Sequence, residues 1–153
     1  MIIPLLTAIH VISVLIWIGG VVFVTIIVFP MIQRMEESME KVMFFQGVEH
    51  RFGKIAKLCV AIAGITGFAL LHLMKMEAVL FTKQGIAVAL MLFLWTLYLL
   101  ILIFEGRLFK ILFQGKAQHN TSEIFKTLAI FHWFIMGISL FAVFLGVYKG
   151  HGG

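Results

Sequence analysis

Four long stretches of the chain contain no Asp, Glu, Lys or Arg, and they dominate the pattern of hydrophobic and polar positions. These stretches are Met1–Gln33, Leu58–Met74, Gln84–Phe104 and Thr127–Tyr148. A helix needs about 20 mostly apolar residues to cross the hydrocarbon core of a bilayer. Long basic side chains at the flanks can snorkel and lengthen a short stretch. We therefore predict four transmembrane helices, at about residues 2–33, 53–76, 83–110 and 124–148.

The composition agrees with a single membrane domain. The 153 residues are 62% hydrophobic and only 12% charged, whereas a soluble domain is about 45–50% apolar and about 25% charged. Backbone groups in lipid must be hydrogen-bonded within the protein, which favours helices. The single Cys59 excludes an internal disulfide. The predicted fold class is all-α, a transmembrane four-helix bundle in one domain over residues 1–153.

Basic residues are concentrated in two of the three loops and their flanks. The first and third loops hold nine, which are Arg34, Lys41, Arg51, Lys54, Lys57, Arg107, Lys110, Lys116 and Lys126. The second loop and the tail hold three, which are Lys75, Lys83 and Lys149. The positive-inside rule then places the first loop (between helices 1 and 2) and the third loop (between helices 3 and 4) in the cytoplasm, and both termini outside. The membrane would be a bacterial-type inner (plasma) membrane. No basic stripe with interleaved aromatics indicates nucleic-acid binding.

Histidines are the candidate functional residues, because ionisable groups inside a bilayer are costly and mark functional sites. His10 and His132 lie inside predicted spans, on opposite halves of the membrane. His72 lies at the outer end of the second helix, and His50 precedes that helix on the cytoplasmic side. Imidazole is a common metal ligand and an axial ligand of haem iron. The sequence favours one haem b between His10 and His72, and a weaker second pairing of His132 with His50.

Other residues could belong to a haem site or to ordinary helix packing. Trp17 follows His10 by seven residues, on the same helical face. The small residues Ala63, Gly64 and Gly67 could form a wall for a macrocycle or a close helix contact. Arg51 and Lys54 could pair with haem propionates, or could serve only to orient the chain in the membrane.

Methionines provide an alternative metal chemistry. His72 is followed by Met74 and Met76, and a histidine with two thioethers suits Cu(I). A second group recurs every fourth residue along the first loop, and comprises Met31, Met35, Met39 and Met43. That group is either a thioether ladder for copper or the apolar face of a helix extension. Copper is therefore the alternative cofactor.

The first helix resembles that of the CopD-like superfamily of small membrane proteins. The resemblance rests on the run from Ala8 to Gly20, with His10, Trp17 and a Gly-Gly pair, and on Pro30 ten residues later. Similarity continues from Arg51-Phe52-Gly53-Lys54 to Gly64-Ile65-Thr66-Gly67. HemJ-type protoporphyrinogen oxidases share the His-to-Trp spacing and an element similar to Glu49-His50-Arg51. Unlike them, this chain has no Pro in its second helix and no Asn-Glu-x-Pro-like element before its fourth. The resemblance implies haem b or copper association through His10.

The sequence thus leads to a functional hypothesis and two alternatives. We expect a small b-type cytochrome with one or two haems that transfers electrons in the bilayer, with quinone or a redox partner protein as its partner. A copper-handling protein of CopD type and a haem-metabolism oxidase of HemJ type are the alternatives. Whether the chain is itself a membrane oxidoreductase, and whether it forms a homo-oligomer, are left open by the residues.

Overall fold

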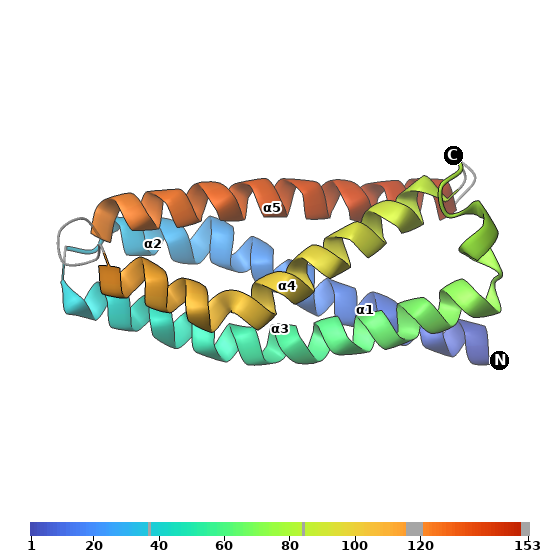
Figure 1. Cartoon of the computed structure of the whole chain (residues 1–153), viewed down its shortest axis with the longest axis horizontal. Helices are drawn as coiled ribbons and strands as arrows, with labels where there is room; N and C mark the ends of the chain where they lie inside the picture. Colours follow the sequence, from blue (N-terminus) through green and yellow to red (C-terminus); the bar gives the residue numbers. More distant parts are fainter. Residues whose placement is uncertain (37, 84, 116–120, 151–153) are drawn as a thin grey trace.

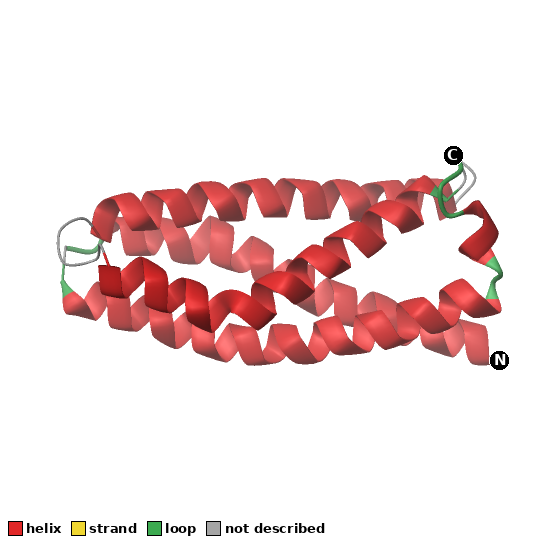
Figure 2. Cartoon of the chain, viewed as in Figure 1, coloured by secondary structure: helices red, strands yellow, loops and turns green. Residues whose placement is uncertain are grey.

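The chain is described by a computed structural model that covers residues 1–36, 38–83, 85–115 and 121–150, with side chains throughout except at 105, 108, 109, 111–115 and 121. Helices account for almost all of it (Figure 2), and no strand occurs in the described ranges. The elements are α1 (Ile2–Phe23), η1 (Val24–Val28), α2 (Phe29–Arg34), α3 (Met39–Leu73), η2 (Met76–Val79), α4 (Ile86–Gly115) and α5 (Thr121–Gly150). The predicted all-α class is confirmed.

Four of the helical segments are long and apolar enough to cross a membrane. They are Ile2–Arg34, Met39–Leu73, Ile86–Phe104 and Ser122–Gly150. The described residues therefore form an up-and-down arrangement of four spans, as the apolar stretches predict. Figure 1 shows that α1 begins and α5 ends at the same end of the bundle, beside the connection from α3 to α4. We call this end the termini end, and we call the other end, which holds the turn at Met35, the Met35 end.

The helices do not pack evenly along the bundle. α1 and α3 lie side by side over most of their length, and this is the most extensive helix contact. α4 contacts α3 through Trp95, and it reaches α5 through Tyr98 and, nearer the termini end, through Met91. Figure 1 shows α4 crossing obliquely from the side of α5 at the termini end to the side of α3 at the Met35 end. The pair α1 and α3 and the pair α4 and α5 are joined most closely in the middle and at the Met35 end of the bundle.

The first span changes its helical geometry just before Pro30. Residues Val24–Val28 form a π-helical turn, in which the N–H of Phe29 donates to the carbonyl of Val24. Proline lacks an N–H, and its ring collides with the carbonyl four residues earlier in a regular α-helix. A widened turn before the proline relieves that collision, so the span continues through α2 to Arg34 without a break.

The helix α3 begins at Met39, about fourteen residues before the start that the hydropathy pattern predicts. Its first turns are amphipathic, and tertiary packing stabilises them because Val42 and Phe45 are buried against Phe29 and Phe125. Lys41 is also buried, and its amine donates to the carbonyl of Met35 at 3.5 Å. The sequence suggests that the segment before residue 53 is a loop. It is instead helical from Met39 and contributes to the core at the Met35 end.

The methionine stripe of the first loop does not exist as one continuous helical face. Met35 has extended backbone angles (φ −73°, ψ 146°) and ends α2, whereas Met39 begins α3. Met31 and Met35 therefore belong to one segment, and Met39 and Met43 to another. The expectation of a single ladder or helix extension with four aligned thioethers is wrong, because the chain reverses direction between the second and third of them.

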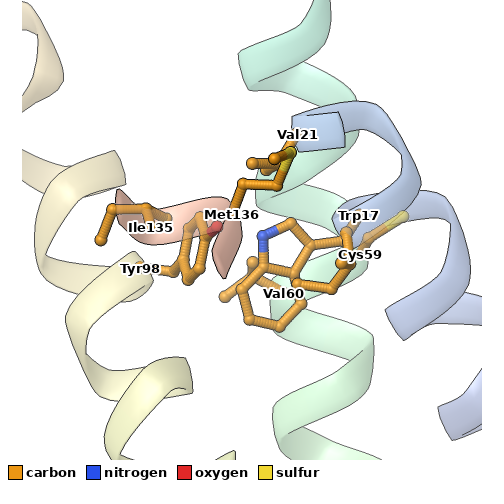
Figure 3. Packing of buried hydrophobic residues seen from close by; sticks show 8 residues of the cluster. Trp17, Val21, Cys59, Val60, Tyr98, Ile135 and Met136 are labelled. Atoms are coloured by element: carbon orange, nitrogen blue, oxygen red, sulfur yellow. The ribbon is translucent and has the colours of Figure 1, made fainter. Parts of the chain in front are cut away.

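Two clusters of buried apolar side chains form the core. The cluster in the middle of the bundle draws residues from all four long helices (Figure 3), which are Trp17, Ile18, Val21, Cys59, Val60, Tyr98, Ile135 and Met136. The cluster at the Met35 end comprises Val24, Val28, Phe29, Ile32, Val42, Phe45, Phe125 and Ala129. His10 lies on the termini side of the first cluster, and His132 lies beside the second.

Candidate functional site

His10 of α1 faces α3 and is held there by two acceptors. Its Nδ1 lies 3.0 Å from the carbonyl oxygen of Ala63 and 3.1 Å from Oγ1 of Thr66. The Thr66 hydroxyl itself donates to the carbonyl of Ile62 at 2.7 Å, so its oxygen is free to accept. Because a carbonyl can only accept, this network assigns the proton to Nδ1. The other nitrogen, Nε2, therefore has its lone pair available.

This arrangement is the one that metal-ligating histidines use in proteins. The N–H on one side of the ring is fixed by a backbone carbonyl, which sets the tautomer and the ring orientation and makes the opposite nitrogen a better ligand. The imidazole lies directly over Gly67, where a Cβ atom would approach Cε1 of His10 to 3.1 Å. The absence of a side chain at Gly67 thus permits the close approach of the His10 ring to α3.

His72 does not lie beside His10. It is exposed at the end of α3, and its Nδ1 lies 2.8 Å from Oε1 of Glu77 in the following turn. The residue that contacts His10, Ala63, is nine residues away, which is about 2.5 helical turns. The two residues therefore project from opposite sides of α3. The predicted axial pair of His10 and His72 is not brought together, because the contact face of α3 is set by the packing of α1.

His132 of α5 meets a carboxylate, and not the histidine that the sequence suggests as its partner. Its Nδ1 lies 2.9 Å from the carbonyl of Leu128 on the same helix, and its Nε2 lies 4.0 Å from Oε1 of Glu49 on α3. The next residue, His50, is exposed. The early start of α3 explains the difference, because it turns Glu49 toward α5 and His50 away from it.

Glu49 is the residue that the sequence interpretation missed, although a signal for it is present. Along α3 the inward positions follow a three-and-four spacing, and comprise Val42, Phe45, Glu49, Phe52 and Ala56. Glu49 is the carboxylate within that otherwise apolar stripe. A helix drawn from Met39 would have placed it in the bundle. The predicted second helix begins at about residue 53, so Glu49 lies outside it and its position in the apolar stripe of α3 was not recognised.

Trp17 lies at the centre of the bundle, two turns from His10 on the same face of α1. Its indole nitrogen is buried and has no hydrogen-bond partner among the described residues. Figure 3 shows this nitrogen on the ring edge that is turned toward Tyr98, and the two rings are T-shaped at 4.6 Å and 87°. The Tyr98 hydroxyl lies 3.1 Å from Oγ of Ser139, which donates to the carbonyl of Ile135. Tyr98 is therefore the donor to Ser139.

The remaining candidates are placed as surface or packing residues. Arg51 and Lys54 are exposed on α3, a position that suits membrane orientation as well as it suits a propionate. Gly64 accommodates the indole of Trp95, which donates to the carbonyl of Val60 at 2.8 Å. Of the small patch on α3, Gly64 thus serves helix packing.

Potential metal ligands among the described side chains include His10 and the turn after α3. Within the described ranges, no cluster of three or more His, Cys, Asp or Glu side chains is found. Near the termini end, the turn after α3 holds His72, Glu77, exposed Met74 and half-buried Met76. His10 is the residue that would hold a haem iron, because the Ala63 carbonyl fixes its Nδ1–H and leaves the Nε2 lone pair for a metal.

Comparison with known proteins provides no relative. No protein-family model matches the chain, and no match is found among curated proteins or among solved structures. The resemblance to the CopD-like superfamily and to HemJ-type oxidases therefore stays a prediction from the residues around His10 and Glu49.

Proposed function

We propose that the protein is a small b-type cytochrome of the membrane, in which His10 is an axial ligand of one haem b. The observation that carries the proposal is the hydrogen bond from His10 Nδ1 to the carbonyl of Ala63. That bond leaves Nε2 as the ligating atom and fixes the direction in which it points. The bound haem would supply reversible one-electron chemistry, with quinone or a redox partner protein as the electron partner.

The chain's own residues have distinct parts in this proposal. The Ala63 carbonyl and the Thr66 hydroxyl hold the imidazole against α3, so that it does not rotate between rotamers. The Ala63 carbonyl accepts a hydrogen bond from Nδ1–H, and this makes the imidazole a stronger electron donor. The donor strength of its ligands is one of the factors that set a haem's reduction potential. Trp17, two turns from His10 on α1, is buried in the first core cluster.

An optical spectrum of the detergent-purified protein tests the proposal. We expect a Soret band and a sharp α-band on reduction, and we expect His10→Ala to lose the haem because the axial nitrogen is removed. His72→Ala is the matched control, and it should keep the full haem content because His72 lies on the opposite side of α3. A His10→Ala protein that retains stoichiometric haem, or a wild-type protein that contains none, would overturn the proposal.

A copper-handling function is the second candidate, and the turn after α3 favours it. Lys75 has a left-handed backbone (φ 53°), and this tight turn brings the side chains of His72 and Glu77 within hydrogen-bond distance. Met74 and Met76 lie in the same short segment. Metal analysis of the same purified sample separates the two candidates. Copper without haem, lost in a Met74→Leu, Met76→Leu double variant, would establish the copper function in place of the cytochrome.

We also propose that the termini end faces outward and the Met35 end faces the cytoplasm of a bacterial-type cell. The basic side chains Arg51 and Lys54 are exposed toward the Met35 end, in keeping with the positive-inside rule. Alkaline phosphatase fused after Gly153 should be active in the periplasm, and a fluorescent protein that folds only in the cytoplasm should stay dark at the same position. The reverse pair of results would contradict this orientation.

A further inference from the structure

We propose that Glu49 and His132 form a proton-binding site between α3 and α5, near the Met35 end of the bundle. One proton is shared between the carboxylate of Glu49 and Nε2 of His132. The proposed haem ligand is His10, on the other half of the bundle, and the proton site does not depend on it. Neither His132 nor His50 is assigned as a metal ligand in the proposed function.

The argument begins with the tautomer of His132. Its Nδ1 lies 2.9 Å from the carbonyl of Leu128, an atom that can only accept, so Nδ1 carries the hydrogen. A neutral imidazole has a single N–H, and Nε2 therefore presents a lone pair. That lone pair faces Oε1 of Glu49 at 4.0 Å. When the carboxylate is ionised and the imidazole is neutral, two acceptors face each other and no hydrogen bond forms between them.

Adding one proton changes this contact from unfavourable to favourable. A proton on either group creates an N–H···O or O–H···N hydrogen bond, and a closure from 4.0 Å to the usual separation of about 2.8 Å completes it. The movement is about 1 Å and is within reach of side-chain rotation. The geometry thus binds one proton and holds it between two helices that are far apart in the sequence.

The surroundings strengthen that interaction. The two side chains are only 19% and 23% exposed, and the imidazole packs on the ring of Phe29 at 4.7 Å. Phe45 and Phe125 lie in the same cluster. Apolar neighbours lower the effective dielectric constant, so the attraction between an imidazolium and a carboxylate is larger than in water.

Within the described residues, charged side chains at the Met35 end lie on α2, α3, α4 and α5. The residue of α2 that contacts the pair is the uncharged Phe29. From α3 the buried Lys41 amine lies 5.4 Å from the centre of the Phe125 ring and donates to the Met35 carbonyl. The further charged groups at this end whose side chains are described are exposed, and they are Arg34, Glu36, Glu40, His50 and Arg51 with Arg107, Lys110, Glu123 and Lys126.

The sequence position of Glu49 supports a role for its charge. It occupies an inward position on α3 between Phe45 and Phe52, where an apolar residue would pack at lower cost. Placing a carboxylate in this half-buried position has an energetic cost that an apolar side chain does not have. The contact with His132 gives the charge of Glu49 a role, because a carboxylate beside Nε2 attracts the proton that Nε2 can bind.

NMR of the purified protein in lipid nanodiscs, with ¹⁵N-labelled histidine, tests the proposal. Resonances of His132 are assigned by their loss in His132→Gln and followed through a pH titration. We expect the neutral imidazole to be the Nδ1–H tautomer. We also expect Glu49→Gln to weaken proton binding at His132 at least tenfold, because a neutral amide does not attract the imidazolium; tenfold is about 1.4 kcal/mol.

Glu40→Gln is the matched control, because Glu40 is an exposed carboxylate near the start of the same helix. It should leave the titration of His132 unchanged, and the signals of His10 should be unchanged in both variants. An Nε2–H tautomer in the wild-type protein would contradict the proposal without any substitution. Equal proton binding at His132 in wild type and Glu49→Gln would contradict it as well. Neither outcome bears on whether His10 holds a haem, which the optical spectrum decides separately.

Discussion

Phe45→Ala should lower the free energy of unfolding by about 3–5 kcal/mol, the range found when a buried phenylalanine is truncated. Phe45 is only 1% exposed and lies between two other rings, with centroids 5.5 Å from Phe29 and 5.2 Å from Phe125. Removing it leaves a cavity where α2, α3 and α5 meet. The loss is one of packing contacts, so it applies at a membrane boundary as it does in water.

The preceding residue provides the control for this prediction. Phe44 is on the same helix but is 41% exposed, and Phe44→Ala should change the stability by no more than about 0.5 kcal/mol. Unfolding both variants with sodium dodecyl sulfate in mixed micelles, followed by circular dichroism, measures the difference. Equal stabilities of the two variants would show that residues 39–52 do not pack as a helix against α2 and α5.

Gly64→Leu should destabilise the bundle by about 2–4 kcal/mol, from overpacking together with one lost hydrogen bond. A Cβ atom at Gly64 would lie 2.6–2.8 Å from three atoms of the Trp95 indole. That indole cannot easily move aside, because it donates to the carbonyl of Val60 at 2.8 Å and is T-shaped against Phe68. The substitution therefore separates α4 from α3 or breaks the Trp95 hydrogen bond.

Gly137→Leu on α5 is the matched substitution, because a Cβ atom there meets nothing within 4 Å. It should leave stability unchanged or raise it slightly, since leucine favours a helix by up to about 1 kcal/mol relative to glycine. The same unfolding titration compares the two variants. If Gly64→Leu unfolds at the wild-type concentration of detergent, α3 and α4 do not approach each other at this glycine.

The helical architecture and the four spans were determined by the sequence alone. Uncharged stretches near the thickness of a bilayer permit few alternatives, because an unpaired backbone group in lipid is costly. The same reasoning identified His10 and His132 as polar groups inside apolar spans. Both are part-buried and hydrogen-bonded in the structure.

Only the tertiary structure decided what each histidine faces. Hydropathy is a local property, and it could not show that Val42 and Phe45 extend α3 back to Met39, since that helix depends on packing against α2 and α5. This extension selects Glu49 over His50 as the neighbour of His132. The rotation of α3 about its axis likewise turns Ala63 and Thr66 toward His10 and turns His72 away. Both facts follow from how helices distant in the sequence pack together, which the periodicity of one segment does not contain.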